Sequence, residues 1–138
     1  MDLDRFVAAQ DAVWQDVEAE LRAGAKRSHW MWFVFPQIAG LGRSATARYY
    51  AIEDLDEARA YLAHPVLGPR LEAAAGWMLR HRGRAPEEIL GGIDAVKLRS
   101  SMTLFERARP DRAVFGEVLG AFYGGERCEA TLERLEET

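Results

Sequence analysis

The chain has 138 residues, with 18 Lys plus Arg against 22 Asp plus Glu and a net charge of −4. This length fits one domain, and a hydrophobic fraction of 49% excludes an intrinsically disordered chain. The negative net charge argues against a protein that coats nucleic acid or an anionic membrane, so neither is expected as a partner.

Neither a leader sequence nor a membrane span is predicted. The N-terminus is acidic, and the longest apolar run, residues 30–35, is far shorter than the roughly 20 residues of a membrane helix. A single Cys cannot form an internal disulfide, which favours a reducing, cytoplasmic location. Three dispersed His and one Cys form no zinc motif, so we expect no metal site and no cofactor.

Helical periodicity dominates the chain. The first predicted helix carries an apolar stripe from Phe6 to Leu21, is capped by Asp2 or Asp4, and ends at Gly24. Proline, glycine and capping residues then divide the rest of the chain into further helices. These are predicted from near 44, over 54–64, from 67 to before 83, from 86, from a cap at Asp94, after 110, and through 132–135.

Residues 30–35 depart from this pattern because they show no 3.6-residue period. A short strand, a buried extended segment and a fully buried helix turn stay open as alternatives, and no partner strand is evident elsewhere. We therefore predict an all-α fold, a single domain over residues 1–138 of about six to eight helices. It includes at most one short extended segment near Trp30–Phe35.

Charge is distributed unevenly along the sequence. Residues 21–52, here called the basic segment, contain no acidic residue and carry a charge of +5, which leaves −9 for the rest. Its cations are Arg22, Lys26, Arg27, Arg43 and Arg48. Either the acidic first helix lies against this segment and neutralises it, or the segment forms a pocket for a small anion.

The densest group of functional side chains is residues 26–32, KRSHWMW. Its cations can bind a phosphate and its indoles, Trp30 and Trp32, can stack on a ring, although core packing of the indoles is the alternative. His29 can titrate near neutral pH and is a candidate acid, base or phosphate contact. Gln37, a further candidate, lies five residues after this group.

Two further groups add candidate ligands. Backbone N–H groups of residues 40–44, with Arg43 and Ser44, precede a predicted helix and can cradle an anion. Asp94, Lys97 and Ser101 are spaced at i, i+3 and i+7, which places them on one stripe of a helix beside its apolar face. They could rim a pocket there, whereas the simpler alternative is a capping Asp94 with a surface ion pair to Lys97.

Several sequence blocks, in this order, resemble one known family. They include 26–37 (KRSHWMWFVFPQ), 40–44 (GLGRS), 61–68 (YLAHPVLG), 94–98 (DAVKL) and 100–105 (SSMTLF). The chain resembles the bacterial domain-of-unknown-function 1810 family, whose members are similar in length and all-helical. The family name carries no activity, so the resemblance implies a fold rather than a function. A fainter similarity is to helical proteins that process ADP-ribosyl or related N-glycosidic compounds.

Two functions are consistent with these patterns. The first is a pocket for a small phosphorylated or nucleotide-like ligand related to ADP-ribose, with hydrolysis in which Asp94 orients water. The second is a non-catalytic helical interaction module, for which no protein partner can be inferred. Predicted catalytic residues are His29, Asp94 and Lys97; predicted ligand-binding residues are Lys26, Trp30, Trp32, Gln37, Arg43, Ser44 and Ser101. Convergence of these residues on one concave surface would favour the first function.

Overall fold

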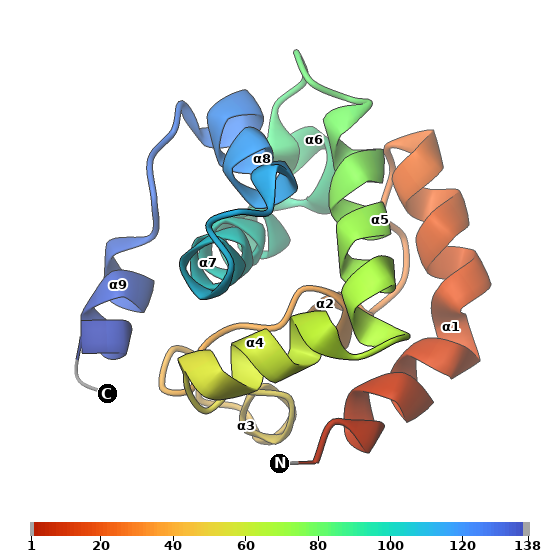
Figure 1. The fold of residues 1–138 in the computed structure, drawn as a ribbon. Coiled ribbons are helices and arrows are strands. Elements are labelled where there is room, and N and C mark those ends of the chain that lie inside the picture. Colours follow the sequence, from red (N-terminus) through yellow and green to blue (C-terminus); the bar gives the residue numbers. More distant parts are fainter. Residues whose placement is uncertain (1, 137–138) are drawn as a thin grey trace.

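Helices account for nearly all regular structure in the chain. The computed structural model describes residues 2–136, and nine helices follow one another in this range (Figure 1). They are α1 (Asp4–Ala23), α2 (Met31–Val34), α3 (Ala45–Tyr49), α4 (Leu55–Ala63), α5 (Leu67–Leu79), α6 (Pro86–Leu90), α7 (Gly92–Ala108), α8 (Ala113–Tyr123) and α9 (Glu129–Glu136). The all-α prediction is confirmed. Within these residues no helix is both long and apolar enough to cross a membrane.

The count exceeds the predicted six to eight because the segment near Trp30–Phe35 forms a helical turn, α2, rather than an extended segment. Phe35 N–H donates to Met31 O, which closes the turn. The side chains of residues 30–35 are all apolar and only Trp32 is partly exposed, so the turn has no polar face. Because helical periodicity is the alternation of buried and exposed residues, such a turn leaves no periodic signal.

Extended pairing occurs a few residues further along the chain. Ile38 and Ile52 form an isolated parallel bridge, in which Ala39 N donates to Ile52 O (2.8 Å) and Ile52 N donates to Gln37 O (2.9 Å). The bridge closes the base of residues 37–53, which we call the bridged loop. Helix α3 lies within this loop.

The helices pack around one apolar core. Helix α7 contacts α4, α6, α8 and α9, while α1 packs against α5 and α2 (Figure 1). Each large apolar side chain buried in this way stabilises the fold by about 1.5–3 kcal/mol. Side chains with no exposed surface include Phe6, Trp30, Tyr61, Phe105 and Phe115.

Two predicted helix caps are wrong. Leu3, not Asp2 or Asp4, occupies the N-cap of α1, and no side chain caps that end. Helix α7 begins at Gly92, so Asp94 lies within the first turn and does not cap it. Glycine at 91, with φ of 86°, provides the start of α7 instead. The Asp94 carboxylate is therefore available to contact other elements.

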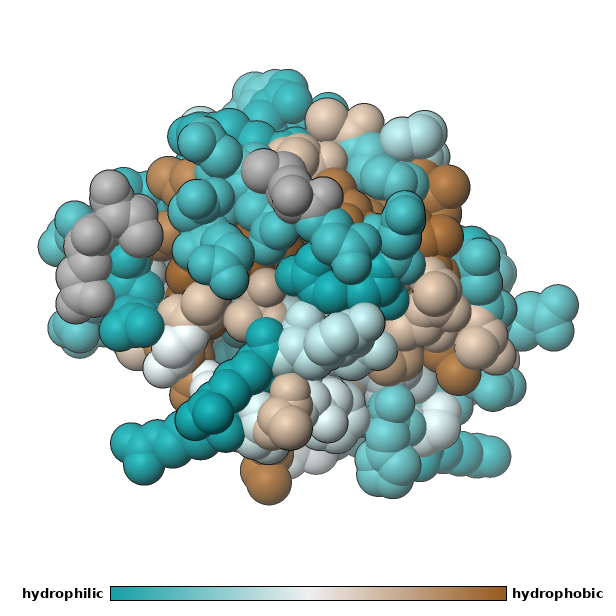
Figure 2. Space-filling view, turned by 90° about the horizontal axis from the view of Figure 1, so that it is seen from below, coloured by the Kyte–Doolittle hydropathy of each residue, from teal (hydrophilic) through white to brown (hydrophobic). Residues whose placement is uncertain are grey.

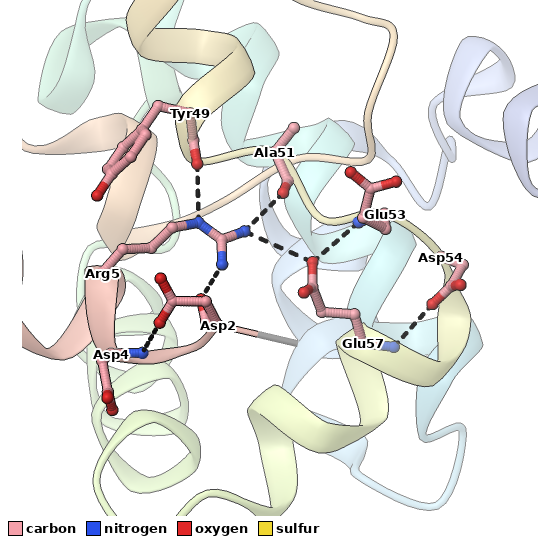
Figure 3. A network of polar contacts seen from close by, with 8 residues as sticks. All are labelled: Asp2, Asp4, Arg5, Tyr49, Ala51, Glu53, Asp54 and Glu57. Atoms are coloured by element: carbon pink, nitrogen blue, oxygen red, sulfur yellow. Dashed lines mark hydrogen bonds and ion pairs between the residues drawn. The ribbon is translucent and has the colours of Figure 1, made fainter.

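Helix α1 is attached to the bridged loop through Arg5 (Figure 3). The Arg5 guanidinium donates to Tyr49 O (2.7 Å) and Ala51 O (2.9 Å) and lies 3.6 Å from the carboxylate of Glu57. Glu57 is buried and accepts a hydrogen bond from Glu53 N (3.0 Å). These contacts fix one side of the bridged loop against the core.

Candidate ligand-binding site

Glu20 of α1 holds residues 27–30 in place. Its carboxylate accepts hydrogen bonds from Arg27 N (2.7 Å), Ser28 N (3.0 Å), Ser28 Oγ (2.6 Å) and Trp30 Nε1 (3.0 Å). Burial raises the pKa of Glu20, but these hydrogen bonds outweigh it and lower the pKa to about 2. The loop that follows α1 is thereby fixed against the helix.

Lys26, Asp94 and Lys97 meet in one group, which we call the lysine cluster. Lys26 Nζ lies 2.8 Å from Asp94 Oδ2 and donates to Ser28 O (2.6 Å), and its side chain is only 7% exposed. Lys97 Nζ lies 3.8 Å from Asp94 Oδ1, is 21% exposed, and makes no hydrogen bond to any residue within 2–136. Two ammonium groups share one carboxylate, so the cluster carries a net charge of +1.

Each lysine of the cluster lies on an indole. Lys26 Nζ is 4.9 Å from the ring centroid of Trp30, and Lys97 Nζ is 4.6 Å from that of Trp32. Such cation–π contacts orient the ammonium groups and are strongest where water is excluded. Trp30 is fully buried, whereas Trp32 is partly exposed and borders two depressions of the surface.

The first depression, the loop hollow, lies in the bridged loop and has a volume of about 220 Å³. Small residues line much of it, and they leave space where larger side chains would fill it. At Gly42 an added Cβ would come within 2.5 Å of Ala47 Cβ. The remaining walls are aromatic and polar. They comprise Trp32, Gln37, Ile38, Arg48, Tyr50 and Glu53.

The second depression, the outer hollow, is wider, at about 530 Å³, and is more open to solvent. His29, Trp32, Tyr49 and Tyr50 contribute to its lining. His29 is exposed and borders this hollow, whereas the loop hollow does not include it. Trp32 and Tyr50 are shared by the two depressions, so they connect the two surfaces.

Comparison with known proteins assigns the chain to a family. Residues 1–135 match the family model described as "Protein of unknown function (DUF1810)". The chain belongs to the DUF1810 family. The crystal structure of the conserved hypothetical protein Rv1873 from Mycobacterium tuberculosis is 51% identical, with 99% of this chain and 98% of that chain covered and a TM-score of 0.97. No curated protein matches this chain.

In this DUF1810 chain, the predicted site residues separate into two sets. Lys26, Trp30, Trp32, Asp94 and Lys97 come together from the loop after α1, from α2 and from α7, although the two groups are far apart in sequence. The cluster thus joins two blocks of sequence that were singled out independently.

The other predicted residues lie elsewhere. Gln37 lines the loop hollow. Ser44 caps α3, because its Oγ accepts from Ala47 N (3.0 Å), and Arg43 is exposed outside the lining of the hollow. Ser101 is fully buried, and its hydroxyl has no hydrogen-bond partner among the described residues. His29 lines the outer hollow together with Trp32, and it makes no ion pair or hydrogen bond with the lysine cluster among the described residues.

Four residues of this region were not predicted as site residues, namely Glu20, Arg48, Tyr50 and Glu53, although Arg48 is one of the cations of the basic segment. The run of Gly and Ala between 39 and 51 was a signal for the hollow, since small side chains at so many positions leave space unfilled. Glu20 gave no local signal, because its four hydrogen bonds depend on how the chain turns after α1. Among residues 2–136, no three His, Cys, Asp or Glu side chains gather in a way that could hold a metal ion.

Proposed function

We propose that the loop hollow and the lysine cluster together bind a small phosphorylated, nucleotide-like ligand. The observation that carries this proposal is the contact between Lys97 and Trp32. Lys97 has no hydrogen bond of its own among the described residues, and it rests on the indole that lines the hollow. A ring stacked on Trp32 would place an attached phosphate beside an ammonium group.

The size of the hollow restricts what can enter it. Sites for drug-sized ligands occupy about 300–1,000 Å³, and the loop hollow, at about 220 Å³, is smaller. It therefore accommodates one ring system, with the phosphate outside it near Lys97. A mononucleotide, or one half of ADP-ribose, is of the appropriate size.

Hydrolysis remains a prediction for this site. The two oxygens of Asp94 face Lys26 and Lys97, so Asp94 serves first to hold the two ammonium groups together. His29 borders the neighbouring outer hollow. The catalytic roles predicted for these residues can be tested by chromatography of ADP-ribose and AMP after incubation. Product formed by the unaltered protein and lost in Asp94→Asn would support them, and unchanged ligand would contradict them.

The alternative, a non-catalytic interaction module, would need a surface suited to another protein. Figure 2 shows one face of the molecule on which hydrophilic and hydrophobic residues are intermixed, without one broad hydrophobic area. Broad exposed apolar areas are typical of docking surfaces. The face in this view therefore gives no support to the alternative.

Isothermal titration calorimetry with ADP-ribose, AMP and inorganic phosphate tests the binding proposal. We expect saturable binding of the nucleotides, accompanied by a higher Tm, and at least a tenfold loss of affinity in both Trp32→Leu and Lys97→Gln. Trp14→Leu and Arg70→Gln are matched controls, because Arg70 also lies on an indole (5.1 Å from the Trp14 ring) but does not line the hollow. Absence of saturable binding, or equal losses in the controls, would contradict the proposal.

A further inference from the structure

The loop hollow contains three polar side chains that no other part of the described structure uses. The side chains of Gln37, Arg48 and Glu53 line it, and within residues 2–136 none of them has a hydrogen-bond or ion-pair partner. Polar side chains that surround a hollow without partners are available to a ligand. They also determine which ligand can satisfy them.

The environment of Glu53 leaves its carboxylate free. Its backbone N–H donates to Glu57 (3.0 Å), while Figure 3 shows its carboxylate directed away from the Arg5–Glu57 pair. Arg5 therefore neutralises Glu57 and not Glu53. Glu53 is exposed at the hollow, and an ionised carboxylate offers hydrogen-bond acceptors only, so it can pair with a ligand only through a donor of that ligand.

The remaining walls favour a flat ring as the source of that donor. Trp32 and Tyr50 provide aromatic surface for stacking, and about 220 Å³ is room for one ring system. Gln37 offers both a donor and an acceptor, the pair of groups that recognises the edge of adenine, and a carboxylate accepts from the amino group of cytosine. Arg48, exposed at the same hollow, adds a second cation for the phosphate.

We infer that the loop hollow selects nucleotides whose base carries an exocyclic amino group over those with a keto group at the same position. This inference rests on the proposed function. An amino group held at Glu53 donates to the carboxylate, whereas a keto oxygen held at the same place would oppose one acceptor with another. Adenine is therefore preferred over hypoxanthine, and cytosine over uracil.

Calorimetric titration of AMP against IMP, and of CMP against UMP, tests this selectivity. We expect AMP and CMP to bind about tenfold more tightly than IMP and UMP, as one well-placed hydrogen bond to a base edge provides. Glu53→Gln should abolish the difference, because an amide can donate to a keto oxygen. Glu117→Gln, at an exposed position of α8 remote in sequence, is the matched control and should preserve it.

The outcomes distinguish a failure of the selectivity inference from a failure of the proposed function. Equal binding of all four nucleotides, tighter binding of the keto bases, or selectivity that survives Glu53→Gln would each overturn this inference and leave the proposed function standing. Absence of binding by all four nucleotides would overturn the proposed function and this inference together. Because the Glu53 side chain has no partner in the described structure, Glu53→Gln should fold normally, which circular dichroism will verify.

Discussion

Two groups of similar composition lie in different parts of the molecule. The lysine cluster consists of a carboxylate, Asp94, with cations stacked on indoles, and the arginine cluster repeats this pattern with Asp11, Arg70 and Trp14. In the arginine cluster, Arg70 Nη2 is 2.8 Å from Asp11 Oδ1, and Arg70 also donates to Gln10 Oε1 (3.5 Å). Its charge is balanced one to one.

The lysine cluster differs in its ratio of charges and in its surroundings. Two lysines share one carboxylate, and Lys97 keeps an ammonium group without a hydrogen bond to any described residue, beside a hollow. The chain has sixteen Arg and two Lys, and both lysines are in this cluster. An ammonium group is a compact charge with three donors, so it can hold one carboxylate and still contact a ligand. The cation of the arginine cluster is thus paired with one carboxylate, whereas the lysine cluster keeps one ammonium group without a hydrogen bond to a described residue.

Among the substitutions that compare the two clusters, replacement of Lys26 should cause the largest loss in the free energy of unfolding. Because Lys26 is nearly buried against Asp94, Lys26→Met should lower the free energy of unfolding by about 3 kcal/mol. Arg70→Met, which breaks a pair whose carboxylate is mainly exposed, should lower it by about 1 kcal/mol at most. Urea denaturation of both variants measures the two values. Equal losses would show that the clusters do not differ in burial or in strength.

Glu20→Gln should weaken the hydrogen bonds that hold residues 27–30, beside the lysine cluster, against α1. An amide at this position retains one acceptor but opposes donors with its own N–H groups, so we expect a loss of about 2 kcal/mol at pH 7. The folded-state pKa of Glu20 is about 2, below its usual 4.5, so its contribution to stability is present above pH 4.5. That contribution is lost as pH falls from 4.5 toward 2. A variant that loses stability over this range as steeply as the unaltered protein would contradict the assignment.

Two glycine-to-alanine substitutions compare a closely packed position of the bridged loop with a position on α5 where there is space for a methyl group. In Gly42→Ala the new Cβ would meet Ala47 Cβ at 2.5 Å, so the bridged loop must shift, at a cost of about 1–2 kcal/mol. Gly76→Ala in α5 meets no atom within 4 Å and should stabilise its helix by about 0.5–1 kcal/mol. Thermal denaturation measures both. Identical shifts in Tm would mean that the loop is not tightly closed at Gly42.

Lys97→Gln should have the smallest effect on folding. Its ammonium group is 3.8 Å from Asp94 and makes no hydrogen bond to a described residue, so we expect a change below about 1 kcal/mol. Differential scanning calorimetry measures this change. A loss as large as that of Lys26→Met would show that Lys97 acts mainly in folding and would argue against its proposed role as the cation that binds the ligand.

The sequence allowed the helices to be predicted better than their contacts. The apolar stripe of α1 and its end at Gly24 are read directly from residue spacing. Asp94 and Lys97 were expected to share a face because their separation is three residues on a helix. Helix α2 was only one of three alternatives for residues 30–35, because every side chain of this segment is apolar and spacing then carries no information.

The lysine cluster shows which part of a site local patterns can provide. They marked residues 26–32 and 94–101 separately, but the contact between Lys26 and Asp94 depends on how α7 packs against the loop after α1. Arg43 and Ser44 had the composition of an anion site, yet Ser44 caps α3 and Arg43 is outside the hollow. Short motifs therefore indicated candidate residues, whereas long-range packing determined which of them lie together.

The bridge between Ile38 and Ile52 has a consequence for how this family can diversify. Both of its hydrogen bonds are made by main-chain groups, so the closure of the bridged loop does not depend on which side chains the loop carries. Residues such as Gln37, Arg48 and Glu53 can be exchanged without changing the helices that support them. If the proposed function holds, these positions would let relatives with the same helices bind different ligands through a few substitutions in a single loop.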